Sequence, residues 1–294
     1  MGKKVLITGI DSFTGYHLKT YLKKQGYEVY GTVFRNGDNQ ETFTCNITDK
    51  LACSSIIQHI QPNFIIHLAG IAYVGHDDTE AFYKVNILGT QNILDALYQV
   101  KSKVQKIILA SSATVYGDQG CEELDESMCP QPANHYGISK LAMEHMAWMY
   151  RDKLPIIIAR PFNYTGIGQS EQFLIPKIVS HFKRKEKVIE LGNLHVAREF
   201  NDVEFVCEVY EKLLRSSFVS ETVNLCSGKA ISLLEIIAYM NQISGYNIEV
   251  KVNPLFVREN EIKRLVGSTK KLKKAISTIK NIEIEETLRK MYEA

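Results

Sequence analysis

A tyrosine and a lysine stand four residues apart in the stretch Tyr136-Gly137-Ile138-Ser139-Lys140. Side chains at that spacing lie on one face of a helix. A free phenol has a pKa of about 10 and exchanges protons poorly at neutral pH unless a neighbour shifts that pKa. A nearby ammonium stabilises the phenolate and lowers it. The pair therefore predicts a proton-transfer group made of Tyr136 and biased by Lys140.

A serine that could join this pair follows an apolar run in residues 107–110, within Ser111-Ser112-Ala113-Thr114-Val115-Tyr116-Gly117. The run is typical of a buried strand, and open α/β sheets bind ligands at the carboxyl ends of their strands. The Ser112 hydroxyl could hold a reacting oxygen there. Because a Tyr-x-x-x-Lys pair alone arises often by chance, the catalytic prediction rests on Ser112, Tyr136 and Lys140 together with the loop described next.

A glycine-containing loop lies near the beginning of the chain, in Thr8-Gly9-Ile10-Asp11-Ser12-Phe13-Thr14-Gly15. It follows a short apolar strand and opens a helix, so backbone N–H groups would face a diphosphate after a tight turn at Gly9. Gly15 would let the helix lie close to the strand. We therefore expect Gly9, Asp11, Ser12, Phe13 and Gly15 to contact a dinucleotide, with an ordinary strand–helix turn as the alternative.

The residues at the end of the second expected strand, Thr32-Val33-Phe34-Arg35, indicate which dinucleotide the protein prefers. An acidic residue there would bind the ribose hydroxyls of NAD, whereas Arg35 could pair with a 2′-phosphate. The sequence therefore favours NADP(H). The alternative is that Arg35 is an exposed loop residue that does not contact the cofactor, in which case NAD(H) is possible.

Strands and helices that could position these residues alternate through the first half of the chain. This pattern is typical of a parallel sheet covered by helices on both faces. We predict an α/β fold, a Rossmann-type doubly wound parallel sheet in residues 1–162, with a smaller C-terminal α/β substrate lobe in residues 163–294 interleaved with it. Strands are expected at 5–8, 28–34, 42–45, 64–68, 104–110, 155–159 and 221–226, and helices at 13–24, 50–60, 82–98, 136–150, 173–184, 203–215 and 233–244.

Composition excludes several other classes. The 294 residues carry a net charge of only +2, which favours neither nucleic acid nor a membrane surface as partner. The 6 cysteines show no metal-ligand spacing and are expected to be reduced, so no metal site is predicted. No signal peptide or membrane-spanning stretch is recognisable, and a cytoplasmic protein is expected. The lysine-rich stretch at 270–274 is interpreted as a solvated helix face.

Taken together, the glycine loop, the serine strand end and the Tyr-x-x-x-Lys pair resemble the extended short-chain dehydrogenase/reductase family. His67-Leu68-Ala69-Gly70 and Val85-Asn86-Ile87-Leu88-Gly89-Thr90 resemble further marks of that family. Residues 160–169, 192–203 and 258–267 are similar to segments of its nucleotide-sugar branch, above all GDP-mannose dehydratases and GDP-4-keto-6-deoxymannose reductases. Ser12 stands where a glycine is usual, and Asn46 where an aspartate is common.

This resemblance implies roles for particular residues. Ser112, Tyr136 and Lys140 would be catalytic, and Asn46, Ile47, Leu68 and Ala69 would join the cofactor contacts. A nucleotide-diphosphate sugar would be held by Thr114, Asn163, Arg198 and Arg258, with the arginines on its diphosphate. Family members usually form homodimers through the two long helices, expected here at 82–98 and 136–150.

The resemblance also separates reaction types. Dehydratases carry acidic residues directly after the serine or threonine, where this chain has Ala113 and Thr114, and neither can act as a carboxylate acid or base. Reduction of the C4 ketone of a 4-keto-6-deoxy nucleotide sugar is therefore expected, the GDP-mannose-derived ketone before the dTDP-glucose-derived one. An NAD-dependent 4-epimerase is the alternative, and a non-catalytic dinucleotide-binding regulator a third possibility.

Overall fold

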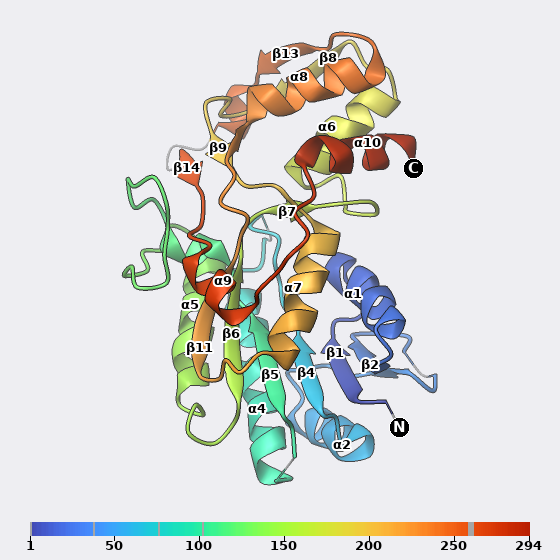
Figure 1. Ribbon diagram of the computed structural model, residues 1–294, viewed down its shortest axis with the longest axis vertical. Coiled ribbons are helices and arrows are strands. Elements are labelled where there is room, and N and C mark those ends of the chain that lie inside the picture. Colours follow the sequence, from blue (N-terminus) through green and yellow to red (C-terminus); the bar gives the residue numbers. More distant parts are fainter. Residues whose placement is uncertain (1, 38, 76, 102, 258–261) are drawn as a thin grey trace.

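A seven-stranded parallel sheet forms the central layer of the computed structural model, which describes residues 2–37, 39–75, 77–101, 103–257 and 262–294 (Figure 1). Its strands lie in the order β11-β6-β5-β4-β1-β2-β3, the arrangement of a doubly wound Rossmann-type sheet. The strands are β1 (Lys4–Thr8), β2 (Glu28–Val33), β3 (Thr42–Thr44), β4 (Phe64–His67), β5 (Lys106–Ala110), β6 (Ile156–Pro161) and β11 (Glu221–Leu225). The predicted fold class is confirmed.

Helices cover both faces of this sheet because its central strands are apolar on both sides. On one face α1 (Phe13–Lys24) and α7 (Val203–Arg215) pack side by side, with Leu18 and Val206 among the buried residues. On the other face lie α2 (Lys50–Ile60), α4 (Thr90–Gln99) and α5 (His135–Trp148), with Leu94 and Met143 buried. The alternating side chains of β1 divide between the two layers, Val5 and Ile7 on the first and Leu6 on the second.

The helix expected at 82–98 is longer and is interrupted. It runs as α3 (Thr79–Tyr83), the π-helical turn η1 (Lys84–Gly89) and α4. Such turns are rare inside helices and are frequent at functional sites. Here the turn places Asn86, which is buried, beside the loop that follows β4. Short 3₁₀ turns occur at η2 (Ala113–Tyr116) and η3 (Pro254–Phe256).

A second lobe lies beyond the carboxyl edge of the large sheet, in the upper part of Figure 1. It contains α6 (Leu174–Lys183), α8 (Leu233–Ser244) and α10 (Ile284–Glu293), which share a hydrophobic core of their own around Phe182 and Ile236. Its strands form small sheets: β7 (Tyr164–Thr165) with β10 (Asn201–Asp202), β8 (Val188–Leu191) with β13 (Glu249–Val252), and β9 (Ala197–Arg198) between β12 (Ile231–Ser232) and β14 (Arg264–Leu265).

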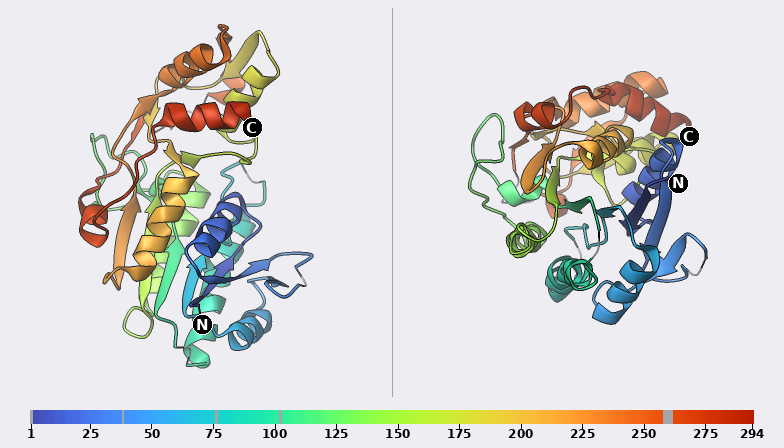
Figure 2. Two further views of the ribbon diagram at one scale, coloured as in Figure 1. Left: turned by 45° about the vertical axis from the view of Figure 1, so that its right-hand side comes forward. Right: turned by 60° about the horizontal axis from the view of Figure 1, so that its bottom comes forward.

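The chain crosses between the two lobes more than once. Helix α7 and strand β11 return to the large sheet after the first passage through the second lobe, and α9 (Lys270–Ala275) packs against β11. The left view of Figure 2 shows α7, in gold, beside the blue α1 and below the orange and red helices of the second lobe, in agreement with the contact between α1 and α7. The boundary at residues 162 and 163 stays a prediction.

Other expectations about the surface can be compared with the described residues. The lysine-rich stretch forms α9, with Leu272 buried and Lys270, Lys273 and Lys274 exposed. Helix α9 agrees with the solvated helix face interpreted from the sequence, whereas α10 was not expected. No helix in the described part of the chain is long and apolar enough to cross a membrane.

Candidate active site

The carboxyl edge of the parallel sheet brings the predicted catalytic residues together. Ser112 follows β5 directly, and Tyr136 lies in the first turn of α5. This helix begins where the sequence allows, because the Asn134 side chain accepts a hydrogen bond from the N–H of Gly137 at 2.9 Å. Lys140 follows one turn later, so both side chains point from α5 toward the end of β5.

The Ser112 hydroxyl lies close enough to Tyr136 to influence the pKa of its phenol. Both side chains are largely buried, each residue being 9% exposed. Burial raises the pKa of Tyr136 to about 12, and the nearby Ser112 hydroxyl, which favours the phenolate, acts in the opposite direction. The sequence predicts a lowered pKa. The structure gives the other sign because desolvation of the phenolate outweighs every stabilising neighbour.

The side chain of Lys140 extends from α5 to the last residue of β5. Its Nζ donates a hydrogen bond to the carbonyl oxygen of Ala110 at 2.7 Å. Burial lowers the pKa of Lys140 to about 8, and the negative charge of Glu144 partly opposes this shift. A Cβ at Gly70 would stand 3.4 Å from the same Nζ, so the ammonium lies between the loops that follow β4 and β5.

A buried ionic network underlies Ser112 and Lys140, and the sequence does not reveal it. The Glu144 carboxylate accepts two hydrogen bonds from the Arg160 guanidinium, at 2.9 and 2.6 Å, and a third from the Ser111 hydroxyl. Arg160 also lies over the ring of Tyr116, 4.8 Å from its centroid. The network joins α5, β5 and β6 at the depth of the site. Charged groups this far from water are stable only when they are paired.

A second buried network connects the glycine loop to α5. His67 at the end of β4 hydrogen-bonds the hydroxyls of Thr8 at 2.7 Å and Thr90 at 2.9 Å. Thr90 in turn donates to the carbonyl of Asn86. The Asn86 amide then donates to Ser139 at 3.0 Å and to the carbonyl of Ile71 at 3.2 Å. Only the motif resemblance around residues 67 and 86 pointed to this region, and it assigned neither residue a role.

The glycine loop has the geometry that a bound diphosphate requires. Gly9 adopts φ +70°, and a Cβ at Gly15 would lie 2.4 Å from the carbonyl oxygen of Gly9. Ser12 caps α1 by accepting the N–H of Gly15 at 3.1 Å. Within the described chain the N–H groups of Phe13 and Thr14 make no hydrogen bond, so both are available at the helix N-terminus. The residues present therefore fit a dinucleotide.

The other predicted cofactor residues lie along the same edge. Leu68 and Ala69 stand beside Gly9: Ala69 donates its N–H to the Thr8 hydroxyl at 3.2 Å, and a Cβ at Gly9 would lie 3.1 Å from Ala69. Arg35 is exposed just after β2, with its guanidinium 5.3 Å from the ring centroid of Phe34.

After β3, Asn46 is exposed and Ile47 is buried. The side-chain oxygen of Asn46 already accepts hydrogen bonds from Thr48, at 3.1 and 2.9 Å. Ile47 packs under the π-helical turn, where a Cβ at Gly89 would come within 2.6 Å of it. Of these two predicted cofactor residues, only Asn46 therefore has an exposed side chain.

The predicted substrate residues are distributed over both lobes. Thr114 lies in η2 beside Ser112, and Asn163 lies between β6 and β7, where its carbonyl accepts the N–H of Asn201 at 2.9 Å. Arg198 in β9 is half-buried and donates to the carbonyl of Ile262 at 3.0 Å. Arg258 lies outside the described residues.

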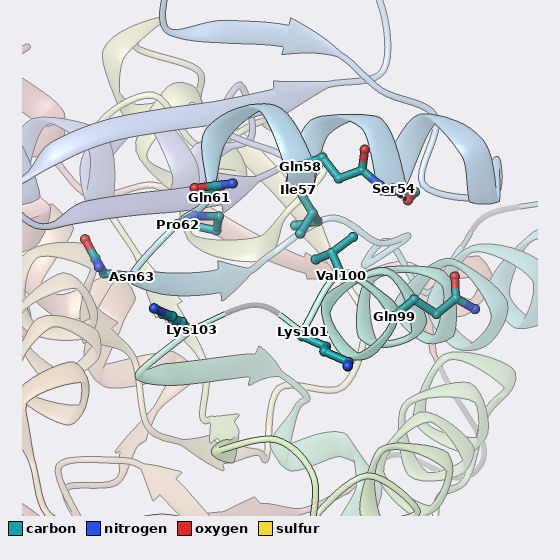
Figure 3. Close-up of a pocket in the computed structure, with 10 residues that line it drawn as sticks. All are labelled: Ser54, Ile57, Gln58, Gln61, Pro62, Asn63, Gln99, Val100, Lys101 and Lys103. Carbon is teal, nitrogen blue, oxygen red and sulfur yellow. Dashed lines mark hydrogen bonds between the residues drawn. The ribbon is translucent and has the colours of Figure 1, made fainter.

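A hollow of about 690 Å³ lies at the opposite end of the sheet (Figure 3). Its lining comes from the end of α2, the end of α4 and the segments before β4 and β5, including Gln61, Asn63 and Lys103. None of the predicted site residues lines it. The predicted catalytic residues Ser112, Tyr136 and Lys140 lie instead at the carboxyl edge.

A Rossmann-type sheet that carries Ser112, Tyr136 and Lys140 at its carboxyl edge defines an extended short-chain dehydrogenase/reductase. Within that class, the profile of the family described as GDP-mannose 4,6 dehydratase matches residues 6–291, and the chain belongs to this family. The GDP-6-deoxy-D-talose 4-dehydrogenase of Aggregatibacter actinomycetemcomitans is 36% identical over 270 residues, covering 92% of this chain and 90% of that protein.

Two solved structures are similar over nearly the whole chain. A candidate epimerase from Burkholderia cenocepacia J2315 superposes with a TM-score of 0.93 at 40% identity, covering 99% of this chain and 97% of that one. RMD from Pseudomonas aeruginosa, solved in complex with NADPH, has a TM-score of 0.86 at 27% identity, with coverages of 99% and 98%. The predicted family is confirmed, and the chain is an NAD(P)-dependent enzyme that acts on nucleotide sugars.

Proposed function

We propose that this enzyme reduces the C4 ketone of a 4-keto-6-deoxy nucleotide sugar. The observation that carries the proposal is that the buried side chains of Ser112, Tyr136 and Lys140 are brought together at the carboxyl edge of the sheet, where Lys140 binds the last carbonyl of β5. A ketone oxygen beside Tyr136 would meet a proton donor held in a fixed position. The similarity to a GDP-6-deoxy-D-talose 4-dehydrogenase supports oxidoreduction at the same carbon of such a sugar.

Each residue has a distinct task in this reaction. A reduced nicotinamide supplies a hydride when it is bound. Tyr136 gives its proton to the oxygen that gains charge as the ketone is reduced, and Ser112 aligns the phenol. The buried ammonium of Lys140 makes the neighbourhood favourable for the phenolate that remains. Asn163, Arg198 and Arg258 hold the nucleotide diphosphate, and positioning of the ketone accounts for most of the acceleration.

Elimination of water from the sugar is disfavoured despite the name of the family. The two residues after Ser112 are Ala113, which is buried, and Thr114, whose hydroxyl donates to Ser112 at 2.9 Å. A 4,6-dehydratase needs an acid and a base at this place, and neither side chain can serve as one.

NADP(H) is the favoured cofactor and NAD(H) the alternative. Arg35 stands free of carboxylate partners among the described residues and is exposed directly after β2, where a 2′-phosphate would lie. Comparison of NADPH with NADH in the same assay tests this preference. Equal kcat/KM values for NADPH and NADH would contradict the proposal that Arg35 binds the 2′-phosphate.

GDP-4-keto-6-deoxymannose is the first substrate to test, and dTDP-4-keto-6-deoxyglucose the second. The purified enzyme is incubated with NADPH and each ketone, while loss of reduced-nicotinamide absorbance and the configuration of the alcohol are recorded. We expect the Tyr136→Phe variant to lose on the order of 10²–10⁴-fold in kcat, the usual contribution of a positioned general acid. Full rate in this variant would contradict the proton-donor role.

An NAD-dependent 4-epimerase is the second candidate, favoured by the likeness to the candidate epimerase from Burkholderia cenocepacia. Such an enzyme would retain NAD through purification and turn over without added cofactor. Purified enzyme that is free of NAD and consumes NADPH in proportion to ketone would exclude it.

A further inference from the structure

The first turn of α1 is contacted by a tyrosine of the second lobe. The hydroxyl groups of Tyr164, in β7, and Thr14 lie 2.7 Å apart, and either of them can donate in this hydrogen bond. The Tyr164 ring also stacks on the ring of Phe13, with the centroids 6.1 Å apart and the ring planes 17° from parallel. A single side chain, 150 residues further along the chain, therefore holds two consecutive residues of the glycine loop.

These two residues are also the ones that could bind phosphate through their backbone. Within the described chain, the N–H groups of Phe13 and Thr14 make no hydrogen bond. A helix N-terminus binds phosphate oxygens through such groups, and the backbone of the first turn sets the direction in which they point. Ser12 stabilises this turn from within by accepting the N–H of Gly15 at 3.1 Å. Tyr164 contacts the same turn from outside.

The segment that carries Tyr164 is itself firmly held. Tyr164 pairs with Asn201 in the parallel ladder of β7 and β10, and the carbonyl of Asn163 accepts the N–H of Asn201 at 2.9 Å. The Tyr164 ring packs against the core on the α1 side of the large sheet. A second contact with α1 follows at Ile167, whose carbonyl oxygen lies 2.8 Å from Nε2 of His17. The segment can therefore act as a fixed support for the first turn of α1.

We propose that Tyr164 is a positioning residue for the dinucleotide. It holds the first turn of α1 in the geometry in which the N–H groups of Phe13 and Thr14 meet the diphosphate. The inference rests on the proposed use of NADPH and adds to it a residue outside the glycine loop. A loop that is ordered before the ligand arrives loses less conformational entropy on binding. A side chain of the second lobe thus raises the affinity for the cofactor.

A fluorescence titration with NADPH tests this role through a double-mutant cycle. We expect Tyr164→Phe to raise the dissociation constant of NADPH about 3–10-fold, the effect of one lost hydrogen bond. Thr14→Val removes the partner hydroxyl and should give a similar rise. Thr14→Ser keeps that hydroxyl and should stay within about 2-fold of the wild type. The double variant, Tyr164→Phe with Thr14→Val, should bind NADPH no more weakly than either single variant.

The matched control is Tyr246→Phe. Tyr246 is also a half-buried tyrosine of the second lobe, its ring centroid lies 5.4 Å from that of Phe182, and its hydroxyl donates to the carbonyl of Glu186 at 3.3 Å. This substitution removes a comparable hydrogen bond far from the glycine loop in the chain, so the dissociation constant of NADPH should not change. Urea unfolding of both tyrosine variants measures their stability separately.

Two results would overturn the proposal. The first is an unchanged dissociation constant in Tyr164→Phe, even if its free energy of unfolding fell, because the contact would then be structural only. The second is a pair of losses that add in the double variant, because Thr14 would then act on the dinucleotide without Tyr164. If the wild type bound NADPH but reduced none of the ketones, the proposed function would fail while the dissociation constants still decided the role of Tyr164.

Discussion

At the scale of single residues, burial determines the pKa values of the catalytic side chains. It lowers the pKa of Lys140 to about 8 and raises that of Tyr136 to about 12. The spacing of Tyr136 and Lys140 shows that they share a helix face, and this part of the site could be predicted from the sequence. The depth of the pair could not, because Glu144, Arg160 and Ser111 meet only after three elements pack.

The buried His67 is expected to make the free energy of unfolding depend on pH. Burial, together with the charge of Lys140, lowers the pKa of this imidazole from 6.5 to about 3. Above pH 6.5 His67 is neutral in both the folded and the unfolded chain and contributes no pH dependence. As the pH falls from 6.5 toward about 3, the unfolded chain binds a proton that the folded chain does not, so stability decreases.

Replacement of His67 by Gln should remove the part of the pH dependence of stability that comes from this imidazole. We expect the free energy of unfolding of the wild type to fall about 2 kcal/mol more than that of His67→Gln between pH 6.5 and roughly pH 5, at about 1.4 kcal/mol for each pH unit. Urea unfolding at both pH values measures the difference. His145→Gln, at an exposed position on α5, is the control and should follow the wild type. Parallel wild-type and His67→Gln curves would refute a neutral buried imidazole.

At the scale of elements, the close packing of α1 against the loop that follows β1 depends on the absence of a side chain at Gly15. A Cβ there would lie 2.4 Å from the Gly9 oxygen and 2.7 Å from the Ile10 Cα, and all of these partners are backbone. We expect Gly15→Ala to push α1 away from the loop, to lower the free energy of unfolding by about 1–3 kcal/mol, and to weaken NADPH binding. Urea unfolding and a fluorescence titration with NADPH check both effects.

The control for this substitution is Gly120→Ala. Gly120, unlike Gly15, has a positive φ of +62°, and nothing lies within 4 Å of the added Cβ. Its cost of about 1–2 kcal/mol comes from the left-handed backbone alone, and NADPH binding should be unchanged. Unaltered NADPH binding in Gly15→Ala would mean that the helix N-terminus does not hold the dinucleotide.

The elements themselves were predicted unequally well. Helices α1, α2, α7 and α8 have the expected bounds because their apolar residues recur with the period of a helix over three turns or more. The two-residue strands β7, β9, β10, β12 and β14 have no period to read, and tertiary pairing alone defines them. The π-helical turn within 84–89 is likewise set by packing, since Ile47 fills the space next to Gly89.

At the scale of the whole molecule, apolar side chains remain exposed on the outer faces of the two long helices. Leu88 is 52% exposed, Ile138 40% and Met149 74%. Helices α4 and α5 pack against each other. Leu88 lies in the turn before α4, Ile138 in α5 and Met149 directly after α5, on the solvent-exposed surface of this helix pair. We propose that this surface is covered by a second copy of the chain, as the family resemblance implies, since exposed apolar patches mark interfaces.

Acidic substitutions on this surface should yield monomers. We expect Leu88→Glu combined with Met149→Glu to halve the mass measured by sedimentation equilibrium, because burying two carboxylates on each side of a symmetric interface is unfavourable. The control is Leu51→Glu, at an 81% exposed position on α2, which should keep the wild-type mass. A monomeric wild type would contradict the proposed dimer.

We propose that the second lobe determines which nucleotide sugar the enzyme binds. Arg198 lies in β9 and Asn163 lies between β6 and β7, outside both the glycine loop and α5. The sequence located these segments through their resemblance to nucleotide-sugar enzymes. Their arrangement could not be predicted, because it depends on how the small sheets around β9 and β7 assemble against the large one.

Transfer of deuterium tests the central claim most directly. The enzyme is supplied with GDP-4-keto-6-deoxymannose and NADPH that carries deuterium on the transferable position of the nicotinamide, and the product is examined by mass spectrometry and NMR. The account predicts one deuterium at C4 of the product sugar for each NADPH consumed, and loss of this transfer in Tyr136→Phe. A product without deuterium, or an isomerised sugar formed while NADPH is not consumed, would contradict it.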